Sequence, residues 1–447
     1  MADDIIAAIA TPPGRGSVGI VRISGPHLES LFEKLTGRRV TPRRAAVMDF
    51  YAEDGSPIDR GLALFFPAPH SYTGEDVIEL QGHGGTVVMQ LLLRRCCDLG
   101  ARVAEPGEFT KRAFLNDKID LAQAEGIADL IDAATTEAAR SAMRSLQGQF
   151  SRAIEALVSS LIELRARIEA VLDFPEEDDI VMPLQAKIER DLESLRARLD
   201  AVFDASRQGS LLREGVRVVL AGHPNVGKSS LLNRLAGENL AIVTPLPGTT
   251  RDAIRQVIDI DGVPLRIVDT AGLRDPRDEI ENIGISISWD EISKADVVLW
   301  ISDITRPETQ TQAFATQNWQ SIKAKQIHVE NKIDLISGAP ALRETNGIFE
   351  ISLSATTGSG VDLLRTAILE TIGWNSHGES TYMARARHLE ALRHAKTHLA
   401  RAIAQSGQLE LLAEELRLTQ NTLASIVGEF TPDDLLGEIF ARFCIGK

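Results

Sequence analysis

Hydrophobic residues in the middle of the chain recur at helical spacing. The two clearest runs are Leu157-Leu161-Leu164-Ile168 and Ile188-Leu192-Leu195-Leu199. Because spacings of three and four residues place side chains on one face of a helix, the pattern predicts helical structure from Ala122 to about Leu212. Phe174-Pro175 interrupts it, since proline cannot continue a helix, and the second helix covers about Leu184 to Arg207. The acidic run at 176–179 is interpreted as a loop or helix start, with a metal site as the alternative.

A second helical segment follows a polar linker after Trp374. Helices resume near Met383 and include Leu409 to Val427. The last one opens at Thr431-Pro432-Asp433-Asp434, which offers an N-cap, a first-turn proline and two acids for the helix dipole. Neither helical segment can bury its apolar stripe alone. We therefore expect 119–212 and 376–447 to form one helical domain, into which 213–375 is inserted.

Residues 1–118 mix strand and helix patterns and are expected to form an α+β domain. The patterns are strands at Ser17–Ile23, Val47–Tyr51 and Gly61–Phe66, a helix from Gly25-Pro26 to about Thr36, and a helix at Gly84–Leu99. Asp54-Gly55 lies between the second and third strands, which indicates an antiparallel meander.

The inserted residues 213–375 alternate strands and helices, which is typical of a doubly wound α/β domain. The strand patterns are Val216–Ala221, Ile254–Ile260, Val263–Val268, Ile327–Glu330 and Ile348–Leu353. Asp261-Gly262 joins the second and third of these as a hairpin, which gives the sheet one antiparallel edge.

The composition is that of an ordinary globular protein of several domains. A length of 447 residues suggests about three domains, and no apolar run approaches the ~18 residues of a membrane span. The acidic Met1-Ala2-Asp3-Asp4 is unlike a secretory signal, and three cysteines cannot make a disulfide framework. We expect a cytoplasmic protein without a membrane partner.

The net charge of −15 argues against a broad basic face for nucleic acid. If RNA is the substrate, a local patch or a basic partner must supply the attraction. Short basic clusters occur at 38–44 and at Arg385 and Arg387. We interpret both clusters as scattered surface charge.

The strongest chemical motif is Gly222-His223-Pro224-Asn225-Val226-Gly227-Lys228-Ser229, between a strand pattern and a helix pattern. Its glycines let backbone N–H groups and the helix N-terminus face a phosphate chain. Lys228 is expected to neutralise the outer phosphates, and the Ser229 hydroxyl to bind Mg²⁺.

Further motifs follow downstream in the inserted residues. Asp269-Thr270-Ala271-Gly272 ends a strand, where Asp269 can hold the Mg²⁺ shell and the Gly272 amide can sense a γ-phosphate. Thr250 offers a second hydroxyl to Mg²⁺. In Asn331-Lys332-Ile333-Asp334 the Asp334 carboxylate can accept two N–H groups of guanine, for which adenine has no match. Ser354-Ala355 completes the base pocket.

Leu273 follows the Asp-Thr-Ala-Gly motif, where Ras-type GTPases place a glutamine that orients water. A leucine cannot do this, so another group must stabilise the developing charge. Asn225 and the backbone carbonyls of 244–249 could hold a monovalent cation against the phosphates. Glu281 is a candidate for positioning the water through a bridging solvent molecule, and a solvated helix charge is the alternative.

Two glycine-rich stretches are interpreted as a loop and a turn, respectively. Gly14 to Gly19 spells G-x-G-x-x-G, but a strand pattern follows it, and a dinucleotide site needs a helix N-terminus there. His83-Gly84-Gly85 is similar to an oxyanion-hole loop, yet the chain has no G-x-S-x-G nucleophile elbow.

The inserted domain resembles the translation-factor-related GTPases, and the whole chain resembles the MnmE (TrmE) family of tRNA-modification GTPases. The residues that carry the family resemblance are the asparagine of the phosphate loop, Gly248-Thr249-Thr250-Arg251-Asp252, Leu273, Leu115-Asn116-Asp117-Lys118, Phe174-Pro175-Glu176-Glu177 and the terminal Phe443-Cys444-Ile445-Gly446-Lys447. An inserted G domain within a helical domain is part of the same resemblance.

The resemblance implies a K⁺-dependent GTPase. Its nucleotide-binding positions would be Asn225, Val226, Gly227, Lys228, Ser229, Ser230, Thr244, Pro245, Leu246, Pro247, Gly248, Thr249, Asp269, Thr270, Ala271, Gly272, Asn331, Lys332, Ile333, Asp334, Ser354, Ala355 and Thr356. The K⁺ ligands would be Asn225, Thr244, Leu246 and Thr249, and Mg²⁺ would be bound by Ser229 and Thr250. The catalytic residues would be Lys228, Glu281 as the water-positioning glutamate, and Cys444 in tRNA modification.

The resemblance also implies a folate and two kinds of protein partner. The N-terminal domain would bind 5-formyltetrahydrofolate, or a related reduced folate, through Arg22, Glu79, Lys118 and Lys447, and would form a homodimer. With an MnmG-type flavoprotein, the chain would add a carboxymethylaminomethyl or aminomethyl group to C5 of the wobble uridine of certain tRNAs. From the residues alone, Arg22 is equally a solvent-facing strand residue and Lys447 a terminal charge.

Two other functions remain open at this point. A regulatory GTPase switch in ribosome assembly would carry the same inserted domain, and the N-terminal domain and Cys444 discriminate against it. An ATPase is opposed by Asp334, because its carboxylate matches guanine.

Overall fold

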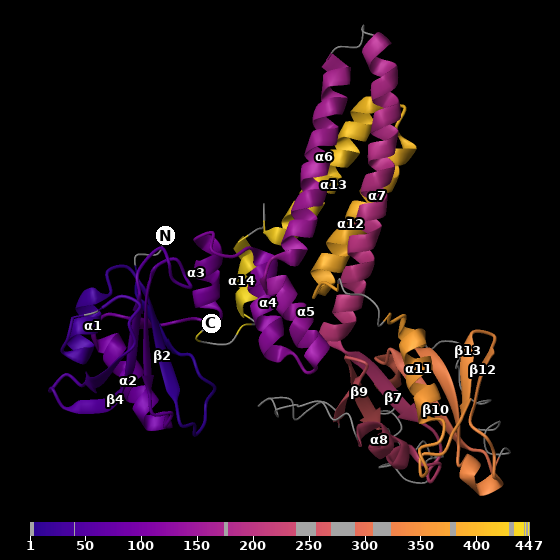
Figure 1. Ribbon diagram of the computed structural model, residues 1–447, viewed down its shortest axis with the longest axis horizontal. Coiled ribbons are helices and arrows are strands. Elements are labelled where there is room, and N and C mark those ends of the chain that lie inside the picture. Colours follow the sequence, from indigo (N-terminus) through magenta and orange to yellow (C-terminus); the bar gives the residue numbers. More distant parts are fainter. Residues whose placement is uncertain are drawn as a thin grey trace. The chain divides into compact units, whose positions relative to one another are not determined.

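The computed structural model describes residues 4–39, 41–173, 178–237, 256–269, 291–306, 323–375, 381–428, 433–441, 443 and 446. The chain divides into two compact units (Figure 1). The first consists of Met1–Ala128, Ile154–Ser159 and Gln420–Lys447, and the second of Asp129–Ala153 and Ser160–Thr419. Within the described ranges, every helix is too short or too polar to cross a lipid bilayer.

The first unit is built on a six-stranded sheet in the order β3-β4-β5-β2-β1-β6. The strands are β1 (Ile6–Ile9), β2 (Gly19–Gly25), β3 (Ala46–Tyr51), β4 (Pro57–Phe66), β5 (Asp76–Gly82) and β6 (Arg102–Val103). Neighbouring strands are antiparallel except β1 and β6, which are parallel. The predicted α+β class is therefore confirmed, as is the pairing of the two strands around Asp54-Gly55.

Helices α1 (Glu29–Thr36) and α2 (Thr86–Asp98) share one core with the sheet. Successive residues of β1 point to opposite faces, so Ala7 joins that core, whereas Ile6 and Ala8 pack with Phe109 on the other face. The Gly14–Gly19 stretch is a loop that enters β2, as predicted, whereas 83–85, predicted to be a turn, is an irregular connection before α2. A strand, β2, and not a helix follows the first stretch, so this stretch lacks the helix N-terminus that a dinucleotide site needs.

The helical part of the chain comprises long helices with buried apolar stripes. They are α3 (Glu108–Leu115), α4 (Leu121–Asp132), α5 (Thr136–Leu146), α6 (Gln149–Asp173), α7 (Asp178–Glu214), α12 (Ala386–Ala404), α13 (Leu409–Val427) and α14 (Asp433–Ala441). In the second unit, α12 lies along α7 (Figure 1). The predicted second helix, about Leu184 to Arg207, is shorter than α7 at both ends. At the C-terminal end the apolar stripe continues from Leu199 to Leu212, both almost fully buried.

Arg385 corrects one interpretation of the sequence. Its guanidinium lies 2.9 Å from Asp129 Oδ1, and the Arg213 guanidinium binds the same oxygen at 2.9 Å. The Asp129 side chain is only 5% exposed, so Arg385 is part of a partly buried ion pair rather than scattered surface charge. Asp129 thereby joins the start of α12 to the end of α7.

The second unit also contains a seven-stranded sheet in the order β12-β13-β11-β10-β7-β9-β8. Its elements are β7 (Val216–Ala221), α8 (Lys228–Ala236), β8 (Gln256–Ile260), β9 (Val263–Asp269), β10 (Val297–Asp303), β11 (Lys325–Asn331), the 3₁₀ turn η2 (Ile333–Ile336), β12 (Ala341–Thr345), β13 (Ile348–Ser352) and α11 (Val361–Ile372). Five parallel strands form the centre. The prediction of one antiparallel edge is incomplete, since β8 and β12 are both antiparallel edges.

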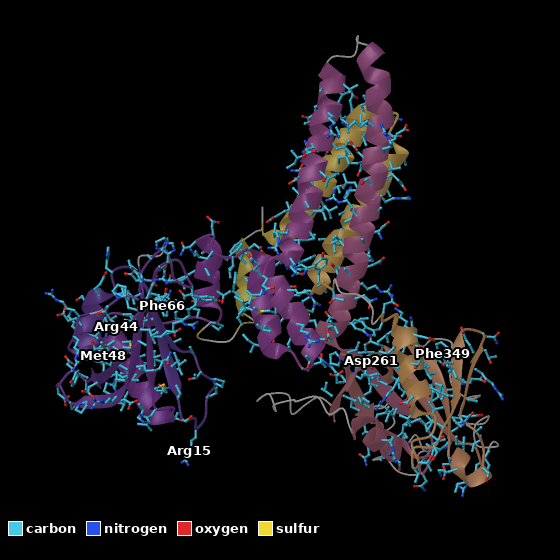
Figure 2. All side chains as sticks on the ribbon, in the orientation of Figure 1. Arg15, Arg44, Met48, Phe66, Asp261 and Phe349 are labelled. Carbon is cyan, nitrogen blue, oxygen red and sulfur yellow. The ribbon has the colours of Figure 1, made fainter. Side chains whose placement is uncertain are left out.

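Residues of β7 alternate between two cores, as expected for a sheet covered on both faces. Val218 and Leu220 pack with α8 and α11, whereas Val219 and Ala221 pack with Trp300. Figure 2 labels Asp261 at the β8–β9 turn and Phe349 on β13. Asp261 and Gly262 have φ values of 48° and 87°, so the predicted Asp-Gly hairpin is confirmed.

Candidate functional site

The phosphate loop lies between β7 and α8, as the sequence predicts. Gly222 and Gly227 have φ values of 149° and 100°, which favour glycine. Neither position has room for a side chain, because a Cβ at Gly222 would collide with the Ile301 carbonyl oxygen and one at Gly227 with the Asn331 amide nitrogen. The α8 N-terminus therefore opens onto a tightly wrapped loop of the kind that binds phosphate.

Lys228 is the first residue of α8 and is 8% exposed. Its Nζ donates to the carbonyl oxygens of Gly222 at 2.8 Å and His223 at 3.1 Å. Ser229 and Ser230 follow it and are exposed. The ammonium group thus lies over the loop, and the two hydroxyl groups are at the exposed start of the helix.

Asn331 joins three of the predicted motifs. It ends β11 and is 2% exposed. Its Nδ2 donates to the Val226 carbonyl at 2.8 Å, and its Oδ1 accepts from the Ala355 amide at 2.9 Å. The structure therefore brings together the phosphate loop, the Asn-Lys-Ile-Asp motif and the Ser-Ala motif. The second and third motifs follow the phosphate loop by more than about 100 residues in the sequence.

Lys332 adds a second connection between the same segments. It has a positive φ of 72°, and its Nζ donates to the Asn225 carbonyl at 2.7 Å and to Asp303 Oδ2 at 2.7 Å. Asn225 itself is exposed and has a φ of 64°. Lys332 consequently holds the backbone of the residue whose amide is the candidate cation ligand.

Asp303 is a residue of this site that sequence reasoning missed. It ends β10, is 7% exposed, and also accepts from the amide and hydroxyl of Thr305 at 3.0 Å and 2.6 Å. Burial would raise the pKa of its carboxyl, but the Lys332 ammonium and the Thr305 donors outweigh burial and lower it. The signal was present, because an acid lies two residues after the apolar run Val297–Ile301, at the same sheet edge as Asn331.

The residues predicted to recognise the base follow β11 and β13. Asp334 is exposed in η2, and Ser354 is fully buried with its Oγ accepting from the Thr357 amide at 3.2 Å. The Arg234 guanidinium donates to the carbonyls of Ala355 and Thr356. A hollow of about 560 Å³ adjoins the predicted pocket and is lined by Ser230, Asn233, Arg234, Gly237, Ala355, Thr356, Gly358, Val361, Asp362 and Arg365.

Several predicted residues lie outside the part of the chain that the structure describes. They are Thr244, Pro245, Leu246, Pro247, Gly248, Thr249, Thr250, Thr270, Ala271, Gly272, Leu273, Glu281, Cys444 and Lys447. For Asp269 the backbone is described: it ends β9 opposite Leu220 of β7. The roles of all these residues stay predictions.

A second cluster of predicted residues lies in the first unit. Arg22 of β2 and Glu79 of β5 are directly opposite in the sheet register, and the guanidinium donates to Glu79 Oε1 at 3.0 Å. The Arg22 guanidinium also lies 5.4 Å from the Tyr72 ring centre and 5.8 Å from that of Phe109. The two charged side chains are 20% and 18% exposed, so Arg22 is not simply a solvent-facing residue.

The C-terminal tail contacts this cluster. The Gly446 carbonyl accepts from Arg22 Nη1 at 3.3 Å. Gly446 has a φ of 96°, and a Cβ there would lie 2.7 Å from the Ile9 carbonyl oxygen. Phe443 is 7% exposed and packs with Phe440 of α14. The described residues on both sides of Cys444 are therefore held against the N-terminal sheet and α14.

Lys118 belongs to the same region through the loop that follows β4. Its Nζ donates to the Pro69 carbonyl at 2.8 Å, and Asn116 Nδ2 donates to the Thr73 carbonyl at 2.7 Å. Tyr72 lies in that loop, next to Arg22. The loop after β4 thus contacts Lys118 at Pro69 and Arg22 at Tyr72.

Comparisons with known proteins agree with this arrangement. The family model of the MnmE helical domain matches residues 121–444, and that of the GTP-binding protein TrmE N-terminus matches residues 5–118. The tRNA modification GTPase MnmE of Nitrosomonas europaea is 56% identical over 451 residues, covering 100% of this chain and 99% of that protein. The protein of that name from Azoarcus sp. is 56% identical over 444 residues, covering 99% and 98%.

Among solved structures, the G domain of the T. maritima FeoB iron transporter is 28% identical. It covers 35% of this chain and 98% of its own, with a TM-score of 0.27. That score is too low for the superposition to support an inference about the whole chain.

Proposed function

The chain belongs to the MnmE family of tRNA modification GTPases, and on this premise we propose that its GTP hydrolysis requires K⁺ and drives modification of a wobble uridine. As a GTPase of this family it uses GTP and Mg²⁺, and its other substrate is tRNA. The proposed product carries a carboxymethylaminomethyl or aminomethyl group at C5, made with an MnmG-type flavoprotein and a folate one-carbon unit.

The exposed amide of Asn225 supports the K⁺ proposal. An amide oxygen is a hard, neutral ligand of the kind that alkali and alkaline-earth cations prefer. The Asn225 backbone is fixed by Lys332, so the side chain projects from a defined point of the phosphate loop. With Thr244, Leu246 and Thr249 it would hold K⁺, whose positive charge would stabilise the negative charge that develops on the phosphates. Leu273 cannot orient the attacking water as a glutamine does. Glu281 would position the attacking water, Ser229 and Thr250 would bind Mg²⁺, and Asp334 would select guanine.

The contact between Arg22 and the Gly446 carbonyl carries the folate proposal. It joins the strand residues Arg22 and Glu79 to the tail on which Cys444 and Lys447 lie. A carboxylate such as Glu79 can accept the N–H groups of a pterin, and Lys118 and Lys447 are cations suited to the folate carboxylates. The bound folate would supply the one-carbon unit, and Cys444 would act on the uridine beside it.

Exposed apolar residues on α2 support a homodimer through the N-terminal domain. Val87 and Leu91 are 71% and 46% exposed and lie four residues apart, on one face of the helix. We also propose the limits 1–118, 119–212, 213–375 and 376–447 for the α+β, helical, G and second helical segments, and a cytoplasmic location.

The proposal is tested with the full-length protein and a Cys444→Ser variant. Calorimetry should detect 5-formyltetrahydrofolate binding to both proteins, and Arg22→Ala should weaken it about tenfold or more, because a charge-assisted contact is lost. In a deletion strain Cys444→Ser should abolish the uridine modification, while GTP turnover in vitro stays within about twofold.

Cys97→Ser is the matched control, since Cys97 is a half-buried cysteine of the same unit on α2. It should modify tRNA normally. Absence of folate binding together with full tRNA modification would refute the folate proposal.

A further inference from the structure

Helix α12 has a charge unlike that of the whole chain. The protein carries a net charge of −15, yet the 19 residues of α12 contain four arginines and lysines and one acid, Glu390. Three histidines add to this basic character. A local basic surface is what an acidic protein needs if it is to bind a nucleic acid itself.

Two arginines and a threonine lie along one exposed face of α12. Arg393, Thr397 and Arg401 are exposed at intervals of four residues, which places them on the same face of the helix. Together with α7 they border a hollow of about 590 Å³, lined by Phe203, Arg393, Lys396, Thr397, Ala400, Arg401 and Ala404. The two helices lie side by side in Figure 1.

The cation at the centre of the stripe is fixed in place. Lys396 Nζ lies 2.6 Å from Asp200 Oδ1 and 4.6 Å from the centre of the Phe203 ring. Arg393 and Arg401 lie on either side of it along the helix. Within the described part of the chain, neither guanidinium has a carboxylate partner, in contrast to Arg196 on α7 and Arg417 on α13.

We propose that this surface of α7 and α12, called here the α12 basic stripe (Arg393, Lys396 and Arg401), binds backbone phosphates of the tRNA. The proposal rests on tRNA being the substrate, and not on the K⁺ or folate assignments. Arginine is suited to phosphate because its planar group donates two parallel hydrogen bonds. Eight residues of helix separate Arg393 from Arg401, about 12 Å, which is enough to span several phosphates of a nucleic acid strand.

The geometry favours backbone contact over base recognition. The single aromatic ring, Phe203, is half-buried and already covered by the Lys396 ammonium, so it offers little surface for stacking. The side chains that line the hollow carry charged donors and the Thr397 hydroxyl, and the neighbouring Asp200 carboxylate is paired with Lys396. Such a surface attracts any tRNA, and its contribution falls with salt.

The test uses the full-length protein carrying Arg393→Glu and Arg401→Glu together. Binding of unmodified tRNA is measured by fluorescence anisotropy over a range of KCl concentrations. We expect the affinity at low salt to fall about tenfold or more, and the slope of log K against log salt to shrink by about 2. The neutral pair Arg393→Gln and Arg401→Gln should give an intermediate affinity and a similar slope. GTP hydrolysis without tRNA should be unchanged.

The matched control reverses the charge of two other exposed arginines by Arg196→Glu and Arg417→Glu. Each of these arginines is paired with an acid of its own helix. It makes the same change in net charge and should lower tRNA affinity much less. Equal losses in the two double variants would overturn the proposal, because they would report net charge alone. Unchanged affinity and slope would also overturn it, as would absence of salt-dependent tRNA binding by the wild-type protein.

A protein partner gives a different pattern of results. If the stripe binds an acidic protein surface, the Arg393/Arg401 variant keeps its tRNA affinity but loses modification in cells, and the proposal is wrong. The tRNA affinity and its salt dependence need neither folate nor K⁺ activation. Failure of the K⁺ or folate proposals is therefore distinguishable from failure of this one.

Discussion

Asn225 combines an unusual backbone conformation with an exposed amide. A φ of 64° lies in the left-handed region, which asparagine tolerates better than most residues. The Lys332 ammonium binds its carbonyl and so stabilises that conformation. Lys332 is in turn oriented by the buried carboxylate of Asp303. Two side chains far from Asn225 in sequence, Lys332 and Asp303, thus determine where the candidate K⁺ ligand lies.

We expect Asp303→Ala to weaken binding of GTP and GDP alike. The substitution removes the carboxylate partner of Lys332 and leaves the Thr305 donors without their acceptor, so both Kd values should rise about tenfold or more. Because the lost interaction is equally present in ground and transition states, kcat at saturating GTP should change by about twofold or less. Titration with a fluorescent GDP analogue and steady-state kinetics measure the two effects.

The Kd values of Asp303→Asn for GTP and GDP should lie between those of wild type and Asp303→Ala, since an amide oxygen still accepts from Thr305. Asp296→Ala is the control at the opposite end of the same strand, where Asp296 accepts from the Arg217 amide at 2.8 Å. It should leave nucleotide affinity unchanged. A lower kcat with unaltered Kd in Asp303→Ala would contradict the positioning role.

At the level of elements, the sequence predicts those whose boundaries are set locally. The strand, loop and helix from Val216 to Ala236 are confirmed, because glycines with special φ values delimit the loop. Helix α13 has the predicted bounds, Leu409–Val427. Edge strand β12 was not predicted, since most of its residues are exposed and its structure comes from pairing with β13.

The candidate site was predictable to the same extent. Motifs at the carboxyl ends of parallel strands meet at one sheet edge, so the approach of Asn331 to the phosphate loop follows from topology. The contact of Gly446 with Arg22 does not, because 424 residues separate them and no local pattern encodes the pairing. Asp303 was overlooked because its strand, β10, was not singled out.

We expect Arg112→Met, a substitution in helix α3, to lower the stability of the first unit. The Arg112 guanidinium is 7% exposed and binds Asp4, Glu75 and Glu108 at 2.8 to 3.2 Å. Removing the cation leaves the largely buried Glu75 and Glu108 and the partly exposed Asp4 without this partner, which should cost about 3–5 kcal/mol in the free energy of unfolding. Hydrogen exchange of the β2 and β5 amides measures the loss.

The same network predicts acid sensitivity. Burial would raise the pKa values of Asp4 and Glu108, but Arg102 and Arg112 outweigh burial and lower both. A depressed folded pKa adds stability above the unfolded pKa, and that stability is lost as pH falls through the folded pKa. Protection of β2 and β5 should therefore decrease below about pH 4. Arg112→Met should show a smaller dependence on pH in this range.

Two controls separate the network from general destabilisation. Arg60→Met removes a 73% exposed arginine of the same unit, 3.7 Å from Asp49, and should cost less than about 1 kcal/mol. All four tryptophans, Trp289, Trp300, Trp319 and Trp374, belong to the second unit, so their fluorescence reports its unfolding. Equal effects of Arg60→Met and Arg112→Met would show that the network adds no stability.

At the level of the whole molecule, the two candidate sites belong to different units. The phosphate loop lies in the second unit, and Arg22 with the tail lies in the first. Helices α4, α6 and α13 each contribute residues to both units. These continuous helices join the two units covalently.

If K⁺ supplies positive charge beside the phosphate loop, initial rates of GTP hydrolysis depend on the cation. They are measured for wild type and Asn225→Ala in KCl and NaCl at matched ionic strength, with and without the partner flavoprotein. We expect wild type to be at least about tenfold faster in K⁺, and Asn225→Ala to lose this difference. Equal wild-type rates in the two salts would contradict it.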